Sequence, residues 1–180
     1  MKVGVIMNYI CRKATREDIV NRWQYLLDIN SGDNSWVVYR DNTLKNFDEG
    51  NIIVYYGLLD NRIICEMCAY IKEEAFIGDI EEPSGLLNQN MAYLAAFRTN
   101  KEFEGCGYFS KLYKFAEDDL KALGYTELSL GVGPEAVRNI EIYFHLGYRD
   151  YIKTTIEHEP PKNEDDIPED EFVNFYKKHL

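Results

Sequence analysis

The sequence predicts one mixed α/β domain. Strand-like runs alternate with amphipathic helical stretches, and no internal repeat is visible. Of the 180 residues, 46% are hydrophobic and 28% are charged, which is an ordinary globular composition. This length fits one domain with a small addition, so we expect a main unit over residues 1–158 and an acidic linker with a short helix over residues 159–180.

The first elements are expected to be a strand and then a helix. Thr15 and Asp18 have the spacing of a helix capping box. Ile19, Trp23 and Leu27 follow at helical intervals. This pattern predicts a helix with one apolar face.

A strand, a hairpin and a long loop are predicted next. Residues 34–42 (NSWVVYRDN) predict a short strand, and residues 51–71 contain two β-rich runs that join in a hairpin at Asp60-Asn61. Residues 73–90 hold acidic residues, two glycines and a proline without periodicity. A loop of this length in a compact domain is often functional.

Two strands with a helix between them follow. Residues 91–99 (MAYLAAFRT) predict a central strand that is apolar on both faces, and residues 125–133 predict a strand with Leu128, Leu130 and Val132 on one side. The stripe of the intervening helix consists of Phe109, Leu112, Ala116, Leu120 and Leu123, and Gly124 ends it.

A second helix is predicted to begin at Pro134, a favourable first helical residue, and to end at Gly147. We expect it to bury Val137, Ile140 and Phe144.

The end of the chain is expected to hold three segments. Residues 148–159 predict a strand, residues 160–171 an acidic linker that contains prolines, and residues 172–180 a short helix.

The charge of the chain bears on its partners. A formal net charge of −11 argues against binding to nucleic acid, which requires a basic face that displaces counterions. The charge fits a cationic or amine-bearing partner, and solubility alone explains it equally well. Because no run is apolar enough to cross a bilayer and no segment resembles a signal peptide, we expect a cytoplasmic protein without a membrane partner.

The cysteines do not have the pattern of a metal site. Cys65 and Cys68 lie in a strand-like run, where residues three apart point to opposite faces, so their thiols are poorly placed to share a metal. The three histidines show no ligand spacing either. We therefore expect free thiols, a reducing compartment and no metal.

Gly105 and Gly107 stand directly ahead of a predicted helix. A helix start offers unpaired N–H donors and partial positive charge, which suit an anion. A P-loop needs a Lys-Ser/Thr pair that does not follow Gly107, and a dinucleotide fingerprint needs a glycine where Ser110 stands. The remaining interpretation is a turn whose amides wrap a pyrophosphate, with a purely structural turn as the alternative.

Several segments, taken in order, resemble the GCN5-related N-acetyltransferases (GNAT). The segment ICRKATREDI (residues 10–19) is similar to the family's strand-to-helix entry, EFEGCG (102–107) to its glycine turn, and YFHLGY (143–148) to its helix end. The resemblance covers residues 8–155. It implies a twisted mixed sheet flanked by helices, with a cofactor cleft between the two central strands. It also implies acetyl transfer from acetyl-CoA to a small-molecule or peptide amine by direct attack, and leaves a homodimer open.

The resemblance further implies the site residues. Tyr143 corresponds to the general acid that protonates the departing thiolate. Asn139 is the expected polar contact to the cofactor, because the family's usual asparagine position is Ala136 here. The full set expected to bind coenzyme A is Phe97, Arg98, Thr99, Glu104, Gly105, Cys106, Gly107, Tyr108, Phe109, Ser110 and Asn139. Glu102 and Glu104 depart from the family pattern, and their charge is expected to weaken binding unless the side chains turn away.

The general base is left open by the sequence. Glu66 in the hairpin and Asp79, Glu81 and Glu82 in the long loop are candidates, and a water relay is an alternative. We also expect the three loop carboxylates to lie near the acceptor and attract a cationic amine. Because the family's glutamate is missing near Met91, a catalytically silent module that binds an acyl-CoA or a partner stands as the second hypothesis.

Overall fold

A computed structural model describes residues 8–163, 165–167 and 169–180. In chain order, its elements are β1 (Tyr9–Lys13), α1 (Arg16–Ile29), α2 (Ser35–Asp48), β2 (Ile52–Leu59), β3 (Arg62–Tyr70), β4 (Met91–Thr99), α3 (Tyr108–Ala122), β5 (Glu127–Val132), α4 (Val137–His145), β6 (Asp150–Glu159) and β7 (Glu169–His179). Short 3₁₀ turns occupy Glu73–Ala75 and Lys101–Phe103.

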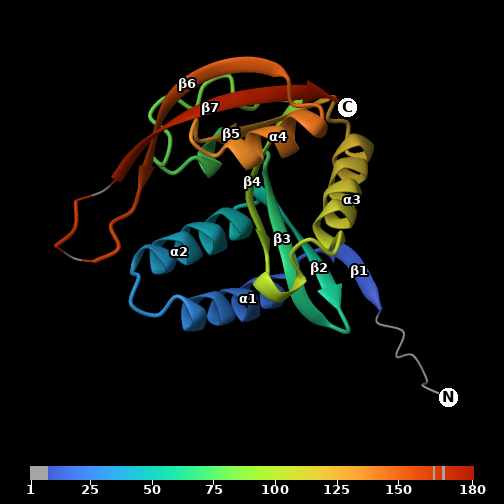
Figure 1. Cartoon of the computed structure of the whole chain (residues 1–180), viewed down its shortest axis with the longest axis vertical. Helices are drawn as coiled ribbons and strands as arrows, with labels where there is room; N and C mark the ends of the chain where they lie inside the picture. The colour runs from blue at the N-terminus through green and yellow to red at the C-terminus, as the bar shows by residue number, and fades with distance from the viewer. Residues whose placement is uncertain (1–7, 164, 168) are drawn as a thin grey trace.

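The described strands form a seven-stranded sheet in the order β1-β2-β3-β4-β5-β7-β6. The β4–β5 pair is parallel, and the other neighbouring pairs are antiparallel. Helices α1 and α2 lie on one face of the sheet, and α3 crosses the other face (Figure 1). The predicted mixed α/β fold is therefore confirmed, with the parallel pair at the centre of the sheet.

The alternation of side chains along β2 explains these layers. Tyr55 belongs to the core cluster that contains Leu112 of α3, whereas Val54 and Tyr56 belong to the cluster that contains Trp23 of α1. Because successive strand residues point to opposite faces, one apolar strand serves both helical layers.

Several local predictions are confirmed. Thr15 caps α1 and forms the reciprocal capping box with Asp18. Asp60 and Asn61 have positive φ values of 48° and 67°. Positive φ at both central residues is the conformation of a two-residue type I′ hairpin turn. Among the predicted strands, β4 and β5 lie where the apolar runs predict them.

The strand predicted over residues 34–42 is wrong, because this segment belongs to α2. Val37 and Val38 favoured a strand, but both are exposed at about two fifths of their surface. Trp36, Tyr39 and Phe47 pack toward α1 and the sheet instead. Their spacing of three and then eight residues follows one face of a helix.

The helix predicted over residues 172–180 is also wrong, because the segment lies in β7. β7 pairs with β5 on one side and with β6 on the other, and it buries Val173 and Phe175 at strand spacing. The segment is therefore an inner strand of the main sheet. Figure 1 shows β6 and β7 as a long hairpin that spans one end of the molecule.

The second predicted helix is shorter and more exposed than expected. α4 begins at Val137, after Pro134, and none of its residues is buried. Val137 is 62% exposed, and Phe144 lies on Tyr176 at a ring distance of 5.5 Å without being enclosed. Gly147, at φ 100°, ends the helix as predicted.

Candidate active site

The sheet opens on one side of β4. Residues Met91–Leu94 pair with Glu127–Leu130 of β5, and the register with β5 ends there. Ala96 then has φ 57°, an unusual value for a residue with a side chain, and the register with β3 shifts between Glu66 and Cys68. This bulge leaves the far end of β4 without a strand neighbour on the β5 side.

A cleft of about 480 Å³ follows this opening, which is within the range of ligand sites in proteins. We call it the β4–α4 cleft. It is lined by the end of β4, by the loop and first turn of α3, and by α4. The lining residues are Phe97, Arg98, Thr99, Phe103, Glu104, Gly105, Gly107, Tyr108, Phe109, Ser110, Arg138, Asn139, Ile142 and Tyr143.

The start of α3 presents backbone donors to this cleft. Gly107 is the N-cap at φ 78° and provides no capping side chain. Within the described residues, the amides of Gly105, Gly107 and the first three residues of α3 have no backbone acceptor, whereas Cys106 N–H donates to Phe103 O. A free helix start of this kind attracts anions through its N–H groups and its dipole.

The charges near this loop are arranged differently from the expectation. Glu102 forms an ion pair with Arg62 at 2.7 Å and does not line the cleft. Glu104 does line it. Arg138, which was not among the predicted site residues, lies on the α4 wall. One of the two expected sources of repulsion is therefore turned away.

Tyr143 lies on the α4 wall of the same cleft. Its ring is 5.7 Å from that of Phe97 on β4 and 6.5 Å from that of Tyr148. Burial raises the pKa of the Tyr143 phenol above its usual value, so the group stays protonated at neutral pH. Among the described residues, its hydroxyl has no hydrogen-bond partner. This hydroxyl is therefore free to donate a hydrogen bond.

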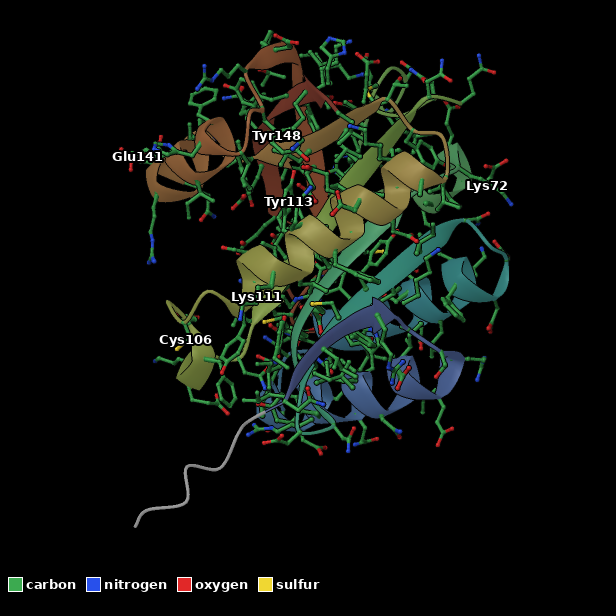
Figure 2. The ribbon with its side chains drawn as sticks, turned by 90° about the vertical axis from the view of Figure 1, so that its right-hand side faces the viewer. Lys72, Cys106, Lys111, Tyr113, Glu141 and Tyr148 are labelled. Atoms are coloured by element: carbon green, nitrogen blue, oxygen red, sulfur yellow. The ribbon has the colours of Figure 1, made fainter. Side chains whose placement is uncertain are left out.

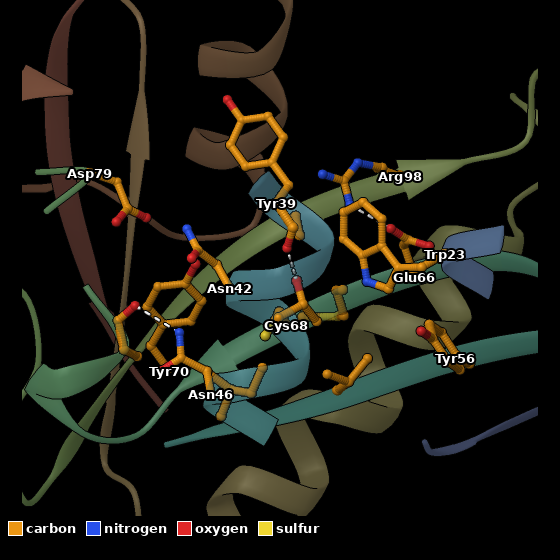
Figure 3. Close-up of a pocket in the computed structure, with 16 residues that line it drawn as sticks. Trp23, Tyr39, Asn42, Asn46, Tyr56, Glu66, Cys68, Tyr70, Asp79 and Arg98 are labelled. Carbon is orange, nitrogen blue, oxygen red and sulfur yellow. Dashed lines mark hydrogen bonds and ion pairs between the residues drawn. The ribbon is translucent and has the colours of Figure 1, made fainter. Parts of the chain in front are cut away.

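A second cavity lies on the α1–α2 side of β4, and we call it the aromatic pocket (Figure 3). Its walls include Trp23, Tyr39, Tyr56 and Tyr70. Arg98 lines both this pocket and the β4–α4 cleft. Arg98 therefore borders both cavities at the end of β4, just past the bulge.

One end of the aromatic pocket holds a buried charge network. Glu66 is 5% exposed and accepts hydrogen bonds from Arg22 Nε on Oε2 and from Arg98 on Oε1, the latter at 2.5 Å. Arg22 is 3% exposed and also donates to Asn100 Oδ1 at 2.8 Å. One carboxylate thus serves two guanidinium groups.

The other end of the pocket carries Asp79, away from Arg98 (Figure 3). Its Oδ1 is buried without a hydrogen-bond partner among the described residues, and burial raises the pKa of this carboxyl. Glu157 of β6 lies close enough for its charge to interact with that of Asp79. Burial and the neighbouring carboxylates raise the pKa of Glu157 to about 7.

The structure brings most of the predicted residues together. All eleven residues of the predicted cofactor set except Cys106 line the β4–α4 cleft, as does Tyr143. Cys106 is exposed on the α3 loop (Figure 2). Of the predicted acceptor residues, Asp79 lines the aromatic pocket, whereas Glu81 and Glu82 are exposed and line neither cavity.

Other functional candidates were not found from the sequence. Arg22 and Trp23 come from α1, and Tyr39 comes from α2. The strand expected in place of α2 hid the helical spacing of Trp36 and Tyr39. Arg138 carried no signal beyond its place one residue before Asn139.

The cysteines lie as the strand pattern predicts. Cys65 and Cys68 belong to core clusters on opposite faces of the sheet, and all four cysteines are free thiols. In the part of the chain that the structure describes, no helix has the length and apolar character needed to span a membrane, and no group of side chains is arranged to bind a metal.

Comparison with known proteins agrees with this geometry. Residues 13–148 match the model of the Acetyltransferase (GNAT) family. A putative acetyltransferase from Acinetobacter baylyi has a similar structure, with a TM-score of 0.64 at 9% identity over 98% of this chain and 95% of that one. The ribosomal-protein-S18-alanine N-acetyltransferase of Escherichia coli gives a TM-score of 0.63 at 12% identity, over 96% and 94% of the two chains.

A third similar structure contains a ligand. The PaiA N-acetyltransferase of Thermoplasma acidophilum, in complex with coenzyme A, gives a TM-score of 0.58 at 14% identity over 97% of this chain and 100% of that one. No curated protein matches the sequence. At these identities, the structural similarity supports the fold.

Proposed function

The chain belongs to the GNAT family of acetyltransferases, and on this premise we propose that it is an N-acetyltransferase that uses acetyl-CoA and a small-molecule or peptide amine. One observation carries the proposal. The residues with free amides at the start of α3, the end of β4 that has no pairing with β5, and Tyr143 all line the same cleft. These are a group that binds anions, a group that binds an extended amide chain, and a proton donor.

Each wall of the cleft has a proposed role toward coenzyme A. The amides of Gly105, Gly107 and the first turn of α3 bind the pyrophosphate. The exposed backbone of Phe97–Thr99 binds the pantetheine arm as a neighbouring strand would. Asn139 and Arg138 add polar contacts from α4. When bound, acetyl-CoA supplies the activated acetyl group.

Tyr143 is proposed as the general acid. Its pKa is raised by burial, so the phenol is protonated at neutral pH and holds its proton on the hydroxyl oxygen until the sulfur departs. The contact with Phe97 keeps the ring beside the open end of β4. A ring that is already held in place loses less rotational entropy when its hydroxyl is oriented for proton transfer.

We place the acceptor in the aromatic pocket, because Arg98 lines both this pocket and the β4–α4 cleft. Among the base candidates, both carboxylate oxygens of Glu66 are occupied by guanidinium groups. Asp79 has a free oxygen and lines the pocket at the end away from Arg98, so we propose that the amine proton reaches it through water rather than directly.

The test has two stages. Calorimetric titration with coenzyme A is expected to show binding, and release of free thiol from acetyl-CoA with a panel of amines is expected to show turnover. Binding without turnover with every amine would favour the silent acyl-CoA-binding module. Absence of coenzyme A binding would contradict both hypotheses.

A further inference from the structure

Arg98 is the only cation among the described residues that line the aromatic pocket. It lies two residues past the bulge at Ala96 and lines both the pocket and the β4–α4 cleft. If the proposed function holds, the acceptor amine has to approach the cofactor beside this residue. The guanidinium therefore lies beside any acceptor that enters the pocket.

The guanidinium is held in place from several sides. It stacks on Trp23 at 5.6 Å and on Trp36 at 5.3 Å from the ring centres, and it donates to Glu66. Figure 3 shows Arg98, Glu66 and Trp23 together at one end of the pocket. A charged group fixed by two aromatic rings loses little freedom when it binds a ligand.

Most donors of this guanidinium are available. An arginine side chain has five N–H donors. Among the described residues, Glu66 is the only hydrogen-bond partner of the Arg98 side chain, and this side chain remains 29% exposed. The free donors can therefore reach a group in the cavity.

The charge balance identifies the kind of group. Glu66 is shared by Arg22 and Arg98, so these three residues carry one net positive charge in a largely buried place. Asp79 lies at the other end of the pocket and does not neutralise it there (Figure 3). An anion next to Arg98 would balance the charge, and the planar guanidinium matches a carboxylate with two parallel hydrogen bonds.

We infer that Arg98 recognises a carboxylate on the acceptor, and that the acceptor is an amino acid whose side chain lies along the aromatic walls. This inference rests on the proposed function and specifies its substrate class. The walls formed by Tyr39, Tyr56 and Tyr70 bound a cavity of about 80 Å³, which suits a small apolar side chain such as that of valine.

Arg98 can be replaced without leaving an unpaired buried carboxylate. In Arg98→Met, Glu66 keeps its contact with Arg22, so the remaining buried pair is neutral. Methionine also retains an unbranched apolar stem for the contacts with Trp23 and Trp36. Arg98→Lys keeps the positive charge and removes the two parallel N–H donors of the guanidinium. Arg16→Met is the control, because Arg16 is an exposed residue of α1 that pairs with Asp48.

The experiment compares valine with isobutylamine, which differ by the carboxylate alone. The measured quantity is the ratio of their kcat/KM values from thiol release. We expect the wild type and Arg16→Met to prefer valine. We expect Arg98→Met to lower the ratio by about 10-fold to 100-fold, as loss of a hydrogen-bonded charge contact does, and Arg98→Lys to lie between. Because both amines react with the same cofactor, the ratio of their kcat/KM values cancels any effect of a variant on cofactor binding.

Four other results would contradict the inference. Equal use of the two amines by the wild type, a preference for diamines over amino acids, or an unchanged ratio in Arg98→Met would each overturn it. So would a loss of coenzyme A affinity in Arg98→Met with the ratio intact, because the arginine would then serve the cofactor.

A binding measurement separates this inference from the proposed function. Calorimetry with N-acetylvaline in the presence of coenzyme A requires no turnover. Binding by the wild type and loss in Arg98→Met support the inference even if every amine fails as a substrate. Turnover without binding of the carboxylate product refutes the inference and leaves the proposed function standing.

Discussion

Replacing Glu66 by glutamine tests the buried charge network beside the active site. Glu66 is the shared acceptor of Arg22 and Arg98, and it is 5% exposed while Arg22 is 3% exposed. Glu66→Gln keeps the shape of the side chain and removes its charge. Arg22 then retains Asn100 as a neutral partner, and two positive charges remain close together without a carboxylate between them.

The expected loss of stability is large. Removal of one partner from a buried ion pair typically costs about 3–5 kcal/mol, because a buried charge is left without compensation. With a urea slope of about 2 kcal/mol per molar, the midpoint of unfolding should fall by about 1.5–2.5 M. The assay is urea unfolding followed by circular dichroism at neutral pH.

Two variants serve as comparisons. Asp48→Asn removes the acid of the exposed Arg16–Asp48 pair, and we expect it to unfold at the wild-type midpoint because solvent already screens this pair. Arg22→Met combined with Glu66→Gln removes the buried pair as a unit, and we expect it to recover part of the loss. A wild-type midpoint for Glu66→Gln alone would refute the reasoning, because it would mean that water reaches and solvates both guanidinium groups.

Three further predictions concern the cleft and the acidic residues near the aromatic pocket. Gly107→Val should lower coenzyme A affinity by about tenfold or more in calorimetry, because a φ of 78° is strained for valine and the α3 amides would have to move. The control is Gly124→Val, at a glycine that is also left-handed but lies at the other end of α3, and it should bind coenzyme A as the wild type does. Equal affinities in the two variants would mean that the pyrophosphate binds elsewhere. Tyr143→Phe should lower kcat about 100-fold with coenzyme A affinity unchanged, and full turnover in thiol release would assign the proton to another donor. Glu157 has a pKa raised to about 7, so the folded protein holds its proton where the unfolded chain releases it, and stability should decline as pH rises from about 4.5 through 7. Glu157→Gln should reduce that decline in thermal unfolding between pH 5 and pH 8, and the remainder belongs to carboxyls such as Asp79 and Glu159, whose pKa values are also raised. An unchanged decline would exclude Glu157 as a source.

The cofactor side of the site could be predicted largely from the sequence, because its signals are local. Gly105 and Gly107 ahead of an amphipathic helix specify a turn with free amides, and Tyr143 stands four residues before the glycine that ends α4. Such features depend on neighbours in the chain, so short windows of sequence contain them. The role of each residue toward coenzyme A stays a prediction.

The acceptor side could not be predicted, because long-range packing forms it. The first half of α2 was predicted as a strand because of its valines. The packing of Trp36 and Tyr39 on α1 and the sheet stabilises the helix instead. The final segment was predicted as a helix, and only pairing with β5 and β6 makes it a strand. In both segments, tertiary contacts outweigh local preferences, which differ by about 1 kcal/mol per residue or less.

The contacts between Arg22, Glu66 and Arg98 show most clearly that sequence alone does not predict which distant residues come together. Each residue is an ordinary charged side chain in its own stretch of sequence, and 44 residues separate the first from the second and 32 the second from the third. The sequence by itself determined the helix cap, the hairpin turn, the free amides before α3 and the alternation of the central strands. The tertiary structure alone decided which distant charges share one buried carboxylate, because a charge buried with a partner is stable only when the whole fold holds both in contact.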